Sequence, residues 1–407
     1  MNNKKWMAIL LGGIMAASLA APCSVSAAEK TTLTFWHAMG GTNGEVLQQI
    51  VDDFNASQDE IEIKAEYQGT YDDTITKLKA AMQSDSGLPD VCQMYDVGTK
   101  FMYDSGAVIP VEDKFESTGY DKSSVMEVIS SYYTVDGKQY AMPFNVSTPM
   151  LYYNKDVFEA AGLDPETPPT TYDEVLEDAK KIVESGAAPV GYSQAIYGWF
   201  FEQQLAGLGV TYGNNDNGRK EAVTAVDFDS NGGGLKVFDM WKKLYDSGYF
   251  EDYGTTTADT QTAFFSGQVG MIIESTAILK NAVDSSPFEV GTGYLPRIEQ
   301  NDEGGVIIGG GSLWLTDTGN EANEDAAWKF IEYITTPDVQ AKWSMGTGYF
   351  AINEKAYETE DMKAYLKENP NFETAINQLK DSPVNCNTAG VLSSVCTPER
   401  TPAVSVS

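Results

Sequence analysis

The chain has 407 residues, of which 42% are hydrophobic and 11% aromatic, enough for two or three domains with buried cores. Its 59 acidic and 27 basic residues give a net charge of −32, which repels nucleic acids and anionic lipids. A single histidine, His37, argues against the imidazole-based catalytic and zinc-binding mechanisms. We therefore expect an acidic globular protein that binds no nucleic acid, metal or cofactor.

Residues 1–27 have the layout of a secretory signal peptide. Lys4 and Lys5 precede an apolar stretch from Trp6 to Ala20, which is shorter than the roughly 20 residues that cross a bilayer, and small residues follow it. We expect this segment to be removed on export. The mature protein would then be soluble, in a periplasm or outside the cell.

The mature chain begins with alternating strand and helix patterns, which are typical of a wound α/β sheet. Later segments add a short apolar strand, a helix that begins at the capping box Thr171–Glu174, and two amphipathic helices. In chain order, we expect strands at 32–36, 61–67 and 150–153, and helices at 45–54, 74–82, from 172, at 235–245 and at 326–334.

The glycine clusters at 232–234 and 309–311 match no nucleotide-binding loop. The polar run 214–218 resembles a calcium loop, but Thr224 stands where a bidentate carboxylate is needed, so we expect turns there. Paired carboxylates leave a secreted glycoside hydrolase open as an alternative. Because no catalytic signature is present, the sequence favours a binding protein with a pocket at strand ends, and His37 as a structural or pocket-wall residue.

Eight short motifs, in order along residues 31–357, resemble the extracellular solute-binding proteins of carbohydrate ABC importers. They lie at residues 32–37, 67–71, 93–98, 143–149, 151–156, 161–165, 307–314 and 347–349. Each motif alone is weak, but their order and spacing together are specific. Within the family, they are most similar to the members that bind glycerol 3-phosphate and glycerophosphodiesters.

The resemblance implies an α/β fold of the periplasmic-binding-protein type II, similar to maltose-binding protein. Two lobes would be joined by a hinge, with the solute in the cleft between them. Lobe 1 would comprise residues 28–144 and 276–342, and lobe 2 residues 145–275 and 343–407. Such a protein, expected to be a monomer without catalytic residues, closes around a small solute and delivers it to membrane permease subunits.

Closure requires contacts from both lobes, because a solute that binds the open and closed forms equally well does not shift the equilibrium between them. Hydroxyls and backbone amides at the matching positions suit a phosphate or a polyol. The resemblance implies nine solute-binding residues: Tyr71, Asp96, Ser147, Trp199, Ser275 or its neighbour Thr276, Gly309, Gly310, Tyr349 and Arg400.

Three positions depart from the family pattern. Asp96 stands where the family has a glutamate, so a direct contact would become water-mediated. Ile196 stands where the family has a tryptophan, which enlarges the cleft and favours a glycerophosphodiester or a sugar facing Tyr197 and Trp199. Arg400 is one residue out of register in a short C-terminal segment, so we expect a shortened lobe 2 with an apolar face partly uncovered.

Overall fold

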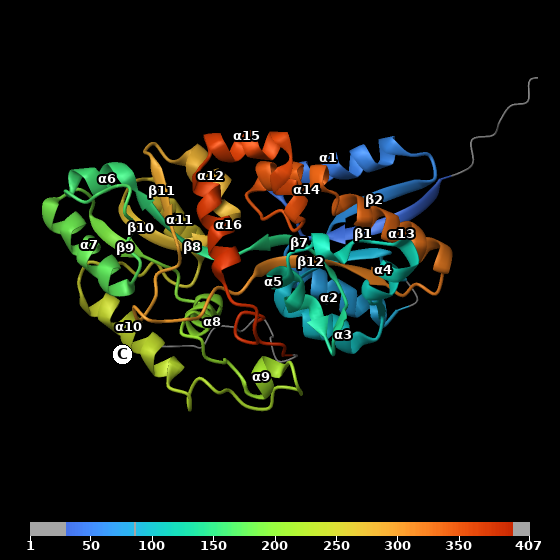
Figure 1. Ribbon diagram of the computed structural model, residues 1–407, viewed down its shortest axis with the longest axis horizontal. Coiled ribbons are helices and arrows are strands. Elements are labelled where there is room, and N and C mark those ends of the chain that lie inside the picture. Colours follow the sequence, from blue (N-terminus) through green and yellow to red (C-terminus); the bar gives the residue numbers. More distant parts are fainter. Residues whose placement is uncertain (1–29, 85–86, 394–407) are drawn as a thin grey trace, which may run out of the picture.

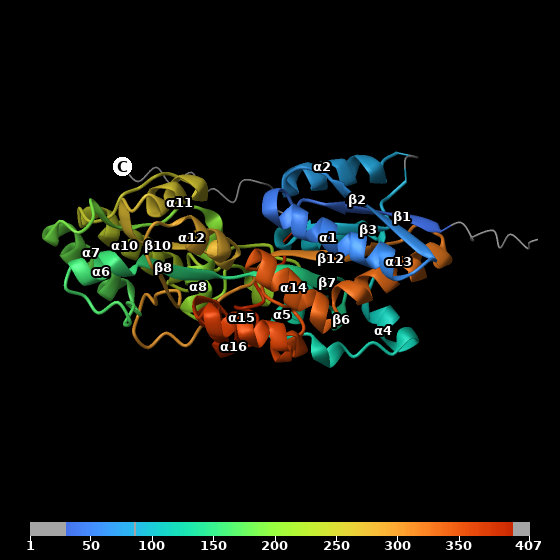
Figure 2. The same ribbon diagram turned by 90° about the horizontal axis from the view of Figure 1, so that it is seen from above.

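The computed structural model describes residues 30–84 and 87–393. The expected signal peptide, Arg400 and the segment expected to leave an apolar face uncovered lie outside these residues. Two β-sheets lie side by side along the long axis of the molecule, each with helices packed against it (Figures 1 and 2). Within the described part of the chain, no helix has both the length and the apolar character needed to cross a membrane.

The first sheet has the strand order β2-β1-β3-β12-β4, and β7 also pairs with β12. β1, β2 and β3 are parallel, whereas β12 runs antiparallel to its neighbours β3, β4 and β7. The strands are β1 (Thr31–His37), β2 (Ile61–Tyr67), β3 (Val91–Tyr95), β4 (Val108–Ile109), β7 (Met142–Ser147) and β12 (Gly309–Thr316).

Helices cover both faces of this sheet. In Figure 1, α1 (Gly41–Ser57) and α14 (Pro337–Thr347) lie above it, and α2 (Tyr71–Met82) and α3 (Thr99–Ser105) lie below. α13 (Glu321–Ile334) packs against β1 and β12. The predicted period-two pattern of β2 is confirmed, because Ile61 and Ile63 are buried while Glu62 and Lys64 are exposed.

The second sheet has the order β11-β8-β10-β9, in which β8 is antiparallel to both of its neighbours. The strands are β8 (Pro149–Asn154), β9 (Val190–Ser193), β10 (Val269–Ser275) and β11 (Val290–Gly293). Its helices include α6 (Lys155–Ala160), α7 (Tyr172–Ser185), α8 (Gly198–Gly207), α10 (Gly233–Asp246), α11 (Thr257–Phe265), α12 (Leu279–Ser285) and α16 (Asn371–Asp381). The predicted capping box begins α7, where Glu174 N–H donates to Thr171 Oγ1 over 3.2 Å.

The strand pairing departs from the expected boundaries of the lobes at two places. β7, expected to leave lobe 1 at residue 144, stays in the first sheet as far as Ser147, which pairs with Gly309. The segment expected to return to lobe 1 at residue 276 first forms β11, which pairs with β8 in the second sheet. The physical reason is that β8 would otherwise leave an open edge, which β11 covers. We therefore place residues 276–293 with the second sheet. The segment 294–308 then carries the chain back to β12 in the first sheet.

Helix α14 also crosses the expected boundary at residue 342. It packs along α1 on the first sheet, so its residues up to Thr347 lie with the first half of the molecule. α16 packs instead on β11 of the second sheet. The C-terminal part of the described chain therefore contacts both halves.

Candidate functional site

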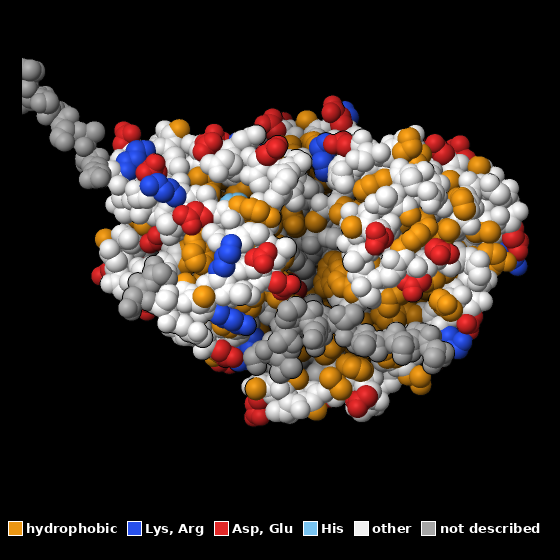
Figure 3. Space-filling model, turned by 180° about the vertical axis from the view of Figure 1, so that it is seen from behind, with side chains coloured by type: hydrophobic (Ala, Val, Ile, Leu, Met, Phe, Trp, Pro, Cys, Tyr) orange, Lys and Arg blue, Asp and Glu red, His pale blue; other side chains and the backbone are white. Residues whose placement is uncertain are grey.

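A cleft of about 380 Å³ lies where strands of both sheets end. Seen from behind, the surface is hollowed between the two halves, with hydrophobic side chains along the hollow (Figure 3). Eight of the nine predicted residues line the cleft: Tyr71, Asp96, Ser147, Trp199, Ser275, Gly309, Gly310 and Tyr349. The ninth, Arg400, lies outside the described residues. The structure thus brings the eight together, and their contact with a solute stays a prediction.

Tyr71 is the first residue of α2, and a capping box holds that helix end in place. Thr70 Oγ1 accepts a hydrogen bond from Asp73 N–H over 3.1 Å, and the Asp73 carboxylate accepts one from Thr70 N–H over 2.9 Å. The Tyr71 ring stacks on Tyr95, with centroids 5.2 Å apart and planes 10° apart. Asn145 Nδ2 donates to the Tyr71 hydroxyl over 2.7 Å, which fixes the phenol at the cleft wall.

Asn145 is itself held by a buried chain of hydrogen bonds. Its Oδ1 accepts from Gln93 Nε2 over 2.6 Å, and Gln93 Oε1 accepts from Ala38 N–H over 2.8 Å. Asn145 and Gln93 are both fully buried, so each of these bonds would be costly to lose. Burial also raises the pKa of Tyr71 well above its ordinary value, so this phenol stays protonated at neutral pH.

Tyr349 follows α14 and completes this wall of the cleft. Its ring lies parallel to Trp343, with centroids 5.7 Å apart and planes 4° apart. The side chain is 8% exposed, and burial raises its pKa above the ordinary value for a tyrosine. Tyr349 is therefore a fixed, neutral hydroxyl.

The two serines lie where the chain passes between the sheets. Ser147 ends β7 and pairs with Gly309 of β12, while Ser275 ends β10. Thr148 N–H donates to Thr276 Oγ1 over 3.1 Å, and Thr276 N–H donates to the Thr148 carbonyl over 2.8 Å. This pair joins the two strand ends. Ser275 is therefore the cleft residue, and Thr276 holds the crossing.

Close approach requires glycine at the start of β12. Gly310 has a φ of +96°, and a Cβ there would lie 1.8 Å from the Asn145 carbonyl oxygen. A Cβ on Gly309 would lie 2.9 Å from Cζ2 of Trp199. These glycines let β12 lie close to Asn145 of β7 and to the indole of α8.

Trp199 is the second residue of α8 and is 8% exposed. Its indole Nε1 has no hydrogen-bond partner among residues 30–84 and 87–393. Tyr197 lies before it, with ring centroids 6.3 Å apart. The indoles of Trp241, Trp314 and Trp343 also lack a partner, so the missing partner alone does not mark a ligand contact. Trp199 differs from these three because it lines the cleft. Ile196 does not line the cleft.

Five further residues line the cleft that the motif comparison did not include in the predicted site: Asp72, Tyr95, Val97, Tyr197 and Ala277. Asp72, Tyr95 and Val97 are immediate neighbours of predicted residues, and Ala277 follows Thr276. Tyr197 was not among the nine but was expected to face a sugar beside Trp199. Among the lining residues that the structure describes, the only charged side chains are the carboxylates of Asp72 and Asp96. The described cleft wall therefore suits groups that donate hydrogen bonds, and it supplies neutral donors for acceptors.

His37 lies outside the cleft lining and is 6% exposed. Its Nδ1 accepts a hydrogen bond from Met39 N–H over 3.3 Å. Burial lowers the pKa of His37 to about 4, so the imidazole is neutral at physiological pH. Its role is therefore structural.

Comparison with known proteins agrees with this geometry. The chain matches the family model for bacterial extracellular solute-binding proteins over residues 49–374. It is 33% identical over 389 residues to the sn-glycerol-3-phosphate-binding periplasmic protein of Brucella abortus (strain 2308), covering 94% of this chain and 89% of the relative. The corresponding protein of Escherichia coli (strain K12) is 31% identical over 360 residues, with 87% and 81% covered.

Solved structures share the fold. UgpB from Mycobacterium tuberculosis in complex with glycerophosphocholine superposes with a TM-score of 0.76 at 23% identity, covering 87% of each chain. The cyclic alpha-maltosyl-1,6-maltose binding protein from Arthrobacter globiformis gives 0.72 at 27% identity, covering 88% and 89%. Maltose-bound T. maritima MalE3 gives 0.71 at 20% identity, covering 88% and 90%. The predicted two-lobed fold, similar to maltose-binding protein, is confirmed, and the chain belongs to the family of bacterial extracellular solute-binding proteins.

Proposed function

We propose that the protein is the exported solute-binding component of an ABC importer. Its solute would be glycerol 3-phosphate, a glycerophosphodiester or another carbohydrate of similar size. The observation that carries this proposal is the cleft, in which residues from both sheets converge on one space. Relatives at 31–33% identity are named for binding sn-glycerol 3-phosphate, and a structure of the same fold holds glycerophosphocholine.

The chemistry of the cleft wall supports a solute that has both hydroxyls and acceptor oxygens. The Asp96 carboxylate, which is 9% exposed, accepts hydrogen bonds and so suits a hydroxyl group. The indole Nε1 of Trp199 only donates, and the hydroxyls of Ser147 and Tyr349 also donate, so these groups suit oxygens of a phosphate. A volume of about 380 Å³ is near the lower end of the usual range for ligand pockets, which favours a small solute.

Solute contacts from both lobes would stabilise the closed form over the open form. The closed protein would then dock on membrane permease subunits as a monomer and release the solute unchanged. We place Arg400 at the phosphate of the bound solute, because the family resemblance assigns an arginine to this part of the chain. A positive charge is otherwise missing from the described cleft wall.

The first experiment is isothermal titration calorimetry with sn-glycerol 3-phosphate, glycerophosphocholine, maltose and glucose. The proposal predicts one saturable site in the cleft, tighter than millimolar, for a glycerol phosphate compound or a sugar, and mass spectrometry should recover that compound intact. Conversion of the compound would support the alternative of a secreted glycoside hydrolase. A protein that binds none of the four would contradict the proposal.

The variants Arg400→Gln and Lys242→Gln form a matched pair, because each removes one positive charge and Lys242 lies outside the cleft lining. If Arg400 contacts phosphate, R400Q should weaken binding of a phosphate-bearing solute by about tenfold or more, while K242Q leaves it unchanged. Equal affinities of R400Q and the wild-type protein would remove Arg400 from the proposed site. Binding of maltose or glucose alone would contradict the phosphate assignment.

A further inference from the structure

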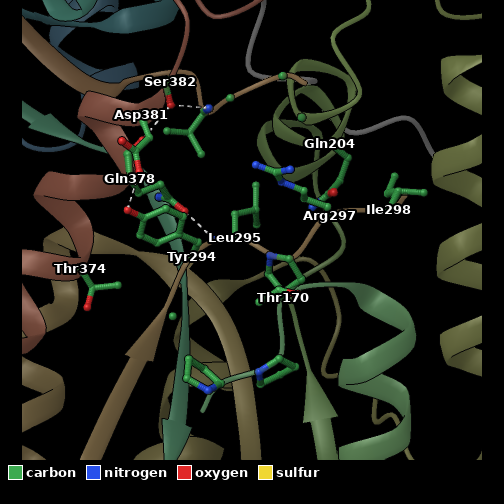
Figure 4. A pocket seen from close by; sticks show the side chains of 18 of the residues that line it. Thr170, Gln204, Tyr294, Leu295, Arg297, Ile298, Thr374, Gln378, Asp381 and Ser382 are labelled. Carbon is green, nitrogen blue, oxygen red and sulfur yellow. Dashed lines mark hydrogen bonds between the residues drawn. The ribbon is translucent and has the colours of Figure 1, made fainter. Parts of the chain in front are cut away.

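A second cavity, of about 550 Å³, lies beside the second sheet and shares no lining residue with the cleft. Its walls are α16, the C-terminal end of α8 and parts of the segment 294–306, which runs from β11 toward β12 (Figure 4). Side chains of α16 and Tyr294 lie on one side of the view, and Arg297 and Gln204 lie on the other. This cavity is not explained by the proposed solute site.

Arg297 brings a positive charge into this cavity. Among the residues that the structure describes, its guanidinium forms no ion pair within 4.0 Å and no side-chain hydrogen bond. Arg297 is exposed. Its main chain is fixed, since Arg297 N–H donates to the Thr170 carbonyl and Tyr172 N–H donates to the Arg297 carbonyl, each over 2.9 Å. In Figure 4 the guanidinium extends over the cavity. An arginine offers five N–H donors, and it prefers carboxylate and phosphate partners.

Gln204 provides an acceptor next to that charge. It is 2% exposed, and its Nε2 donates to the Tyr172 hydroxyl over 2.6 Å, which fixes the amide. Its Oε1 accepts no hydrogen bond from any residue in the described ranges. The side chain lines the cavity beside Arg297 (Figure 4). Because Gln204 Oε1 is not among the fully buried unpartnered atoms, it is open to the cavity, where it suits a donor group on a ligand.

The other polar groups of the cavity are already paired, except for the side chain of the exposed Gln300. Gln378 Oε1 accepts from Leu295 N–H over 2.5 Å, and its Nε2 donates to the Pro149 carbonyl over 2.7 Å. The Asp381 carboxylate accepts from the Tyr294 hydroxyl over 2.8 Å. Pro168, Leu295 and Val306 contribute apolar surface. The Arg297 guanidinium, the Gln204 oxygen and the Gln300 amide therefore remain for a ligand. Asp381, on the opposite side of the view in Figure 4, keeps its negative charge.

We propose that this cavity binds a small organic anion that carries a hydroxyl or amino group next to its carboxylate or phosphate. The anionic group lies against the Arg297 guanidinium, and the hydroxyl or amino group donates to Gln204 Oε1. The carbon skeleton packs on the apolar wall. Because the whole chain has a net charge of −32, an anion gains little elsewhere on the surface, and the local cation decides where it binds.

The cavity and the cleft are connected by two shared elements. α8 lines the cleft at Trp199 and the cavity at Gln204, and the segment leading into β12 lines the cavity at Val306 and the cleft at Gly309. Gln203 joins these elements, since its Nε2 donates to the Ile307 carbonyl over 2.7 Å and its Oε1 accepts from Ile307 N–H over 2.8 Å. Occupancy of the cavity therefore changes the affinity of the cleft for its solute. This coupling between the two sites rests on the proposed function. By linkage, the effect is reciprocal.

Calorimetry on the full chain tests the site directly, with L-lactate, L-malate and glycerol 2-phosphate as probes and no solute present. We expect saturable binding of at least one probe at millimolar concentration, and about tenfold weaker binding by Arg297→Gln. Lys242→Gln is the matched control, because Lys242 pairs with Asp246 on α10 away from the cavity, and it should bind as the wild-type protein does. Propionate, which lacks the hydroxyl of lactate, should bind more weakly than lactate.

The proposed site is wrong if no probe binds, or if R297Q and the wild-type protein bind every probe equally. Probe binding that Trp199→Phe weakens and Arg297→Gln does not would place the probe in the cleft and would also contradict the proposed site. Because the direct titration contains no solute, its outcome does not depend on the proposed function. Once a solute is known, an unchanged solute affinity at saturating probe would refute the connection between the two sites.

Discussion

Replacement of Asp96 by asparagine should weaken solute binding strongly while leaving the fold intact. Asp96 follows β3, and its side chain is 9% exposed at the cleft. Its backbone carbonyl accepts a hydrogen bond from Thr99 Oγ1 over 2.7 Å, so the main chain stays in position when only the carboxylate changes. A hydrogen bond to a charged group contributes about 1.5–3 kcal/mol, which corresponds to roughly 10- to 150-fold in Kd.

The assay is isothermal titration calorimetry of the solute, combined with urea unfolding of each variant. Asp72→Asn is the matched control, because Asp72 also lines the cleft but is exposed to water, and it should change Kd by less than about threefold. Asp96→Glu restores the length of the family's glutamate and should keep the charge interaction. If D96N binds within about twofold of the wild-type protein while unfolding normally, a hydroxyl contact with this carboxylate is refuted.

The remaining predictions concern the indole, the glycine at the start of β12 and the buried histidine. Trp199→Phe should weaken solute binding by about 3- to 10-fold in calorimetry, because it removes an N–H donor at the cleft. Trp314→Phe is the control: it removes another unpartnered indole N–H, but in the core, and should leave Kd unchanged. Gly310→Ala should lower the free energy of unfolding by at least about 2 kcal/mol in urea titrations, because its Cβ would overlap the Asn145 carbonyl. Gly319 also has a positive φ, but the space around its Cβ position is open, so Gly319→Ala should lower the free energy of unfolding by only about 1 kcal/mol. Equal losses of stability in the two variants would contradict the packing argument for Gly310. The pKa of His37 in the folded protein, about 4, lies below the ordinary histidine pKa of 6.5, so the unfolded chain binds more protons between these two pH values. Stability should therefore fall as pH decreases from about 6.5 to 4, by up to about 3 kcal/mol from this group, and His37→Gln should remove that part of the pH dependence.

Local patterns in the sequence predicted much of the fold. The alternation of apolar and polar residues in β2 and the capping box of α7 depend on neighbouring residues only, so they are visible without a structure. The partner of β11 could not be predicted in this way. The residues of β11 pair with β8, more than 130 positions earlier in the chain, and no local pattern specifies that choice.

In the candidate site, too, local motifs were predictable from the sequence and long-range contacts were not. Tyr71, Ser147 and Tyr349 lie in motifs that the family resemblance identifies, and the structure brings them to one cleft. The support behind them was not predicted, because it depends on long-range hydrogen bonds. Asn145 reaches Tyr71, 74 positions away, and Gln93, 52 positions away. The choice between Ser275 and Thr276 likewise required the geometry of the crossing, where Thr276 bonds to Thr148.

A crystal structure of the protein with its solute would test the central claim most directly. We predict electron density for one solute molecule between Asp96 of the first half and Trp199 of the second half, with hydrogen bonds to both. Density for the solute at a different place, or in contact with only one half of the molecule, would contradict the account.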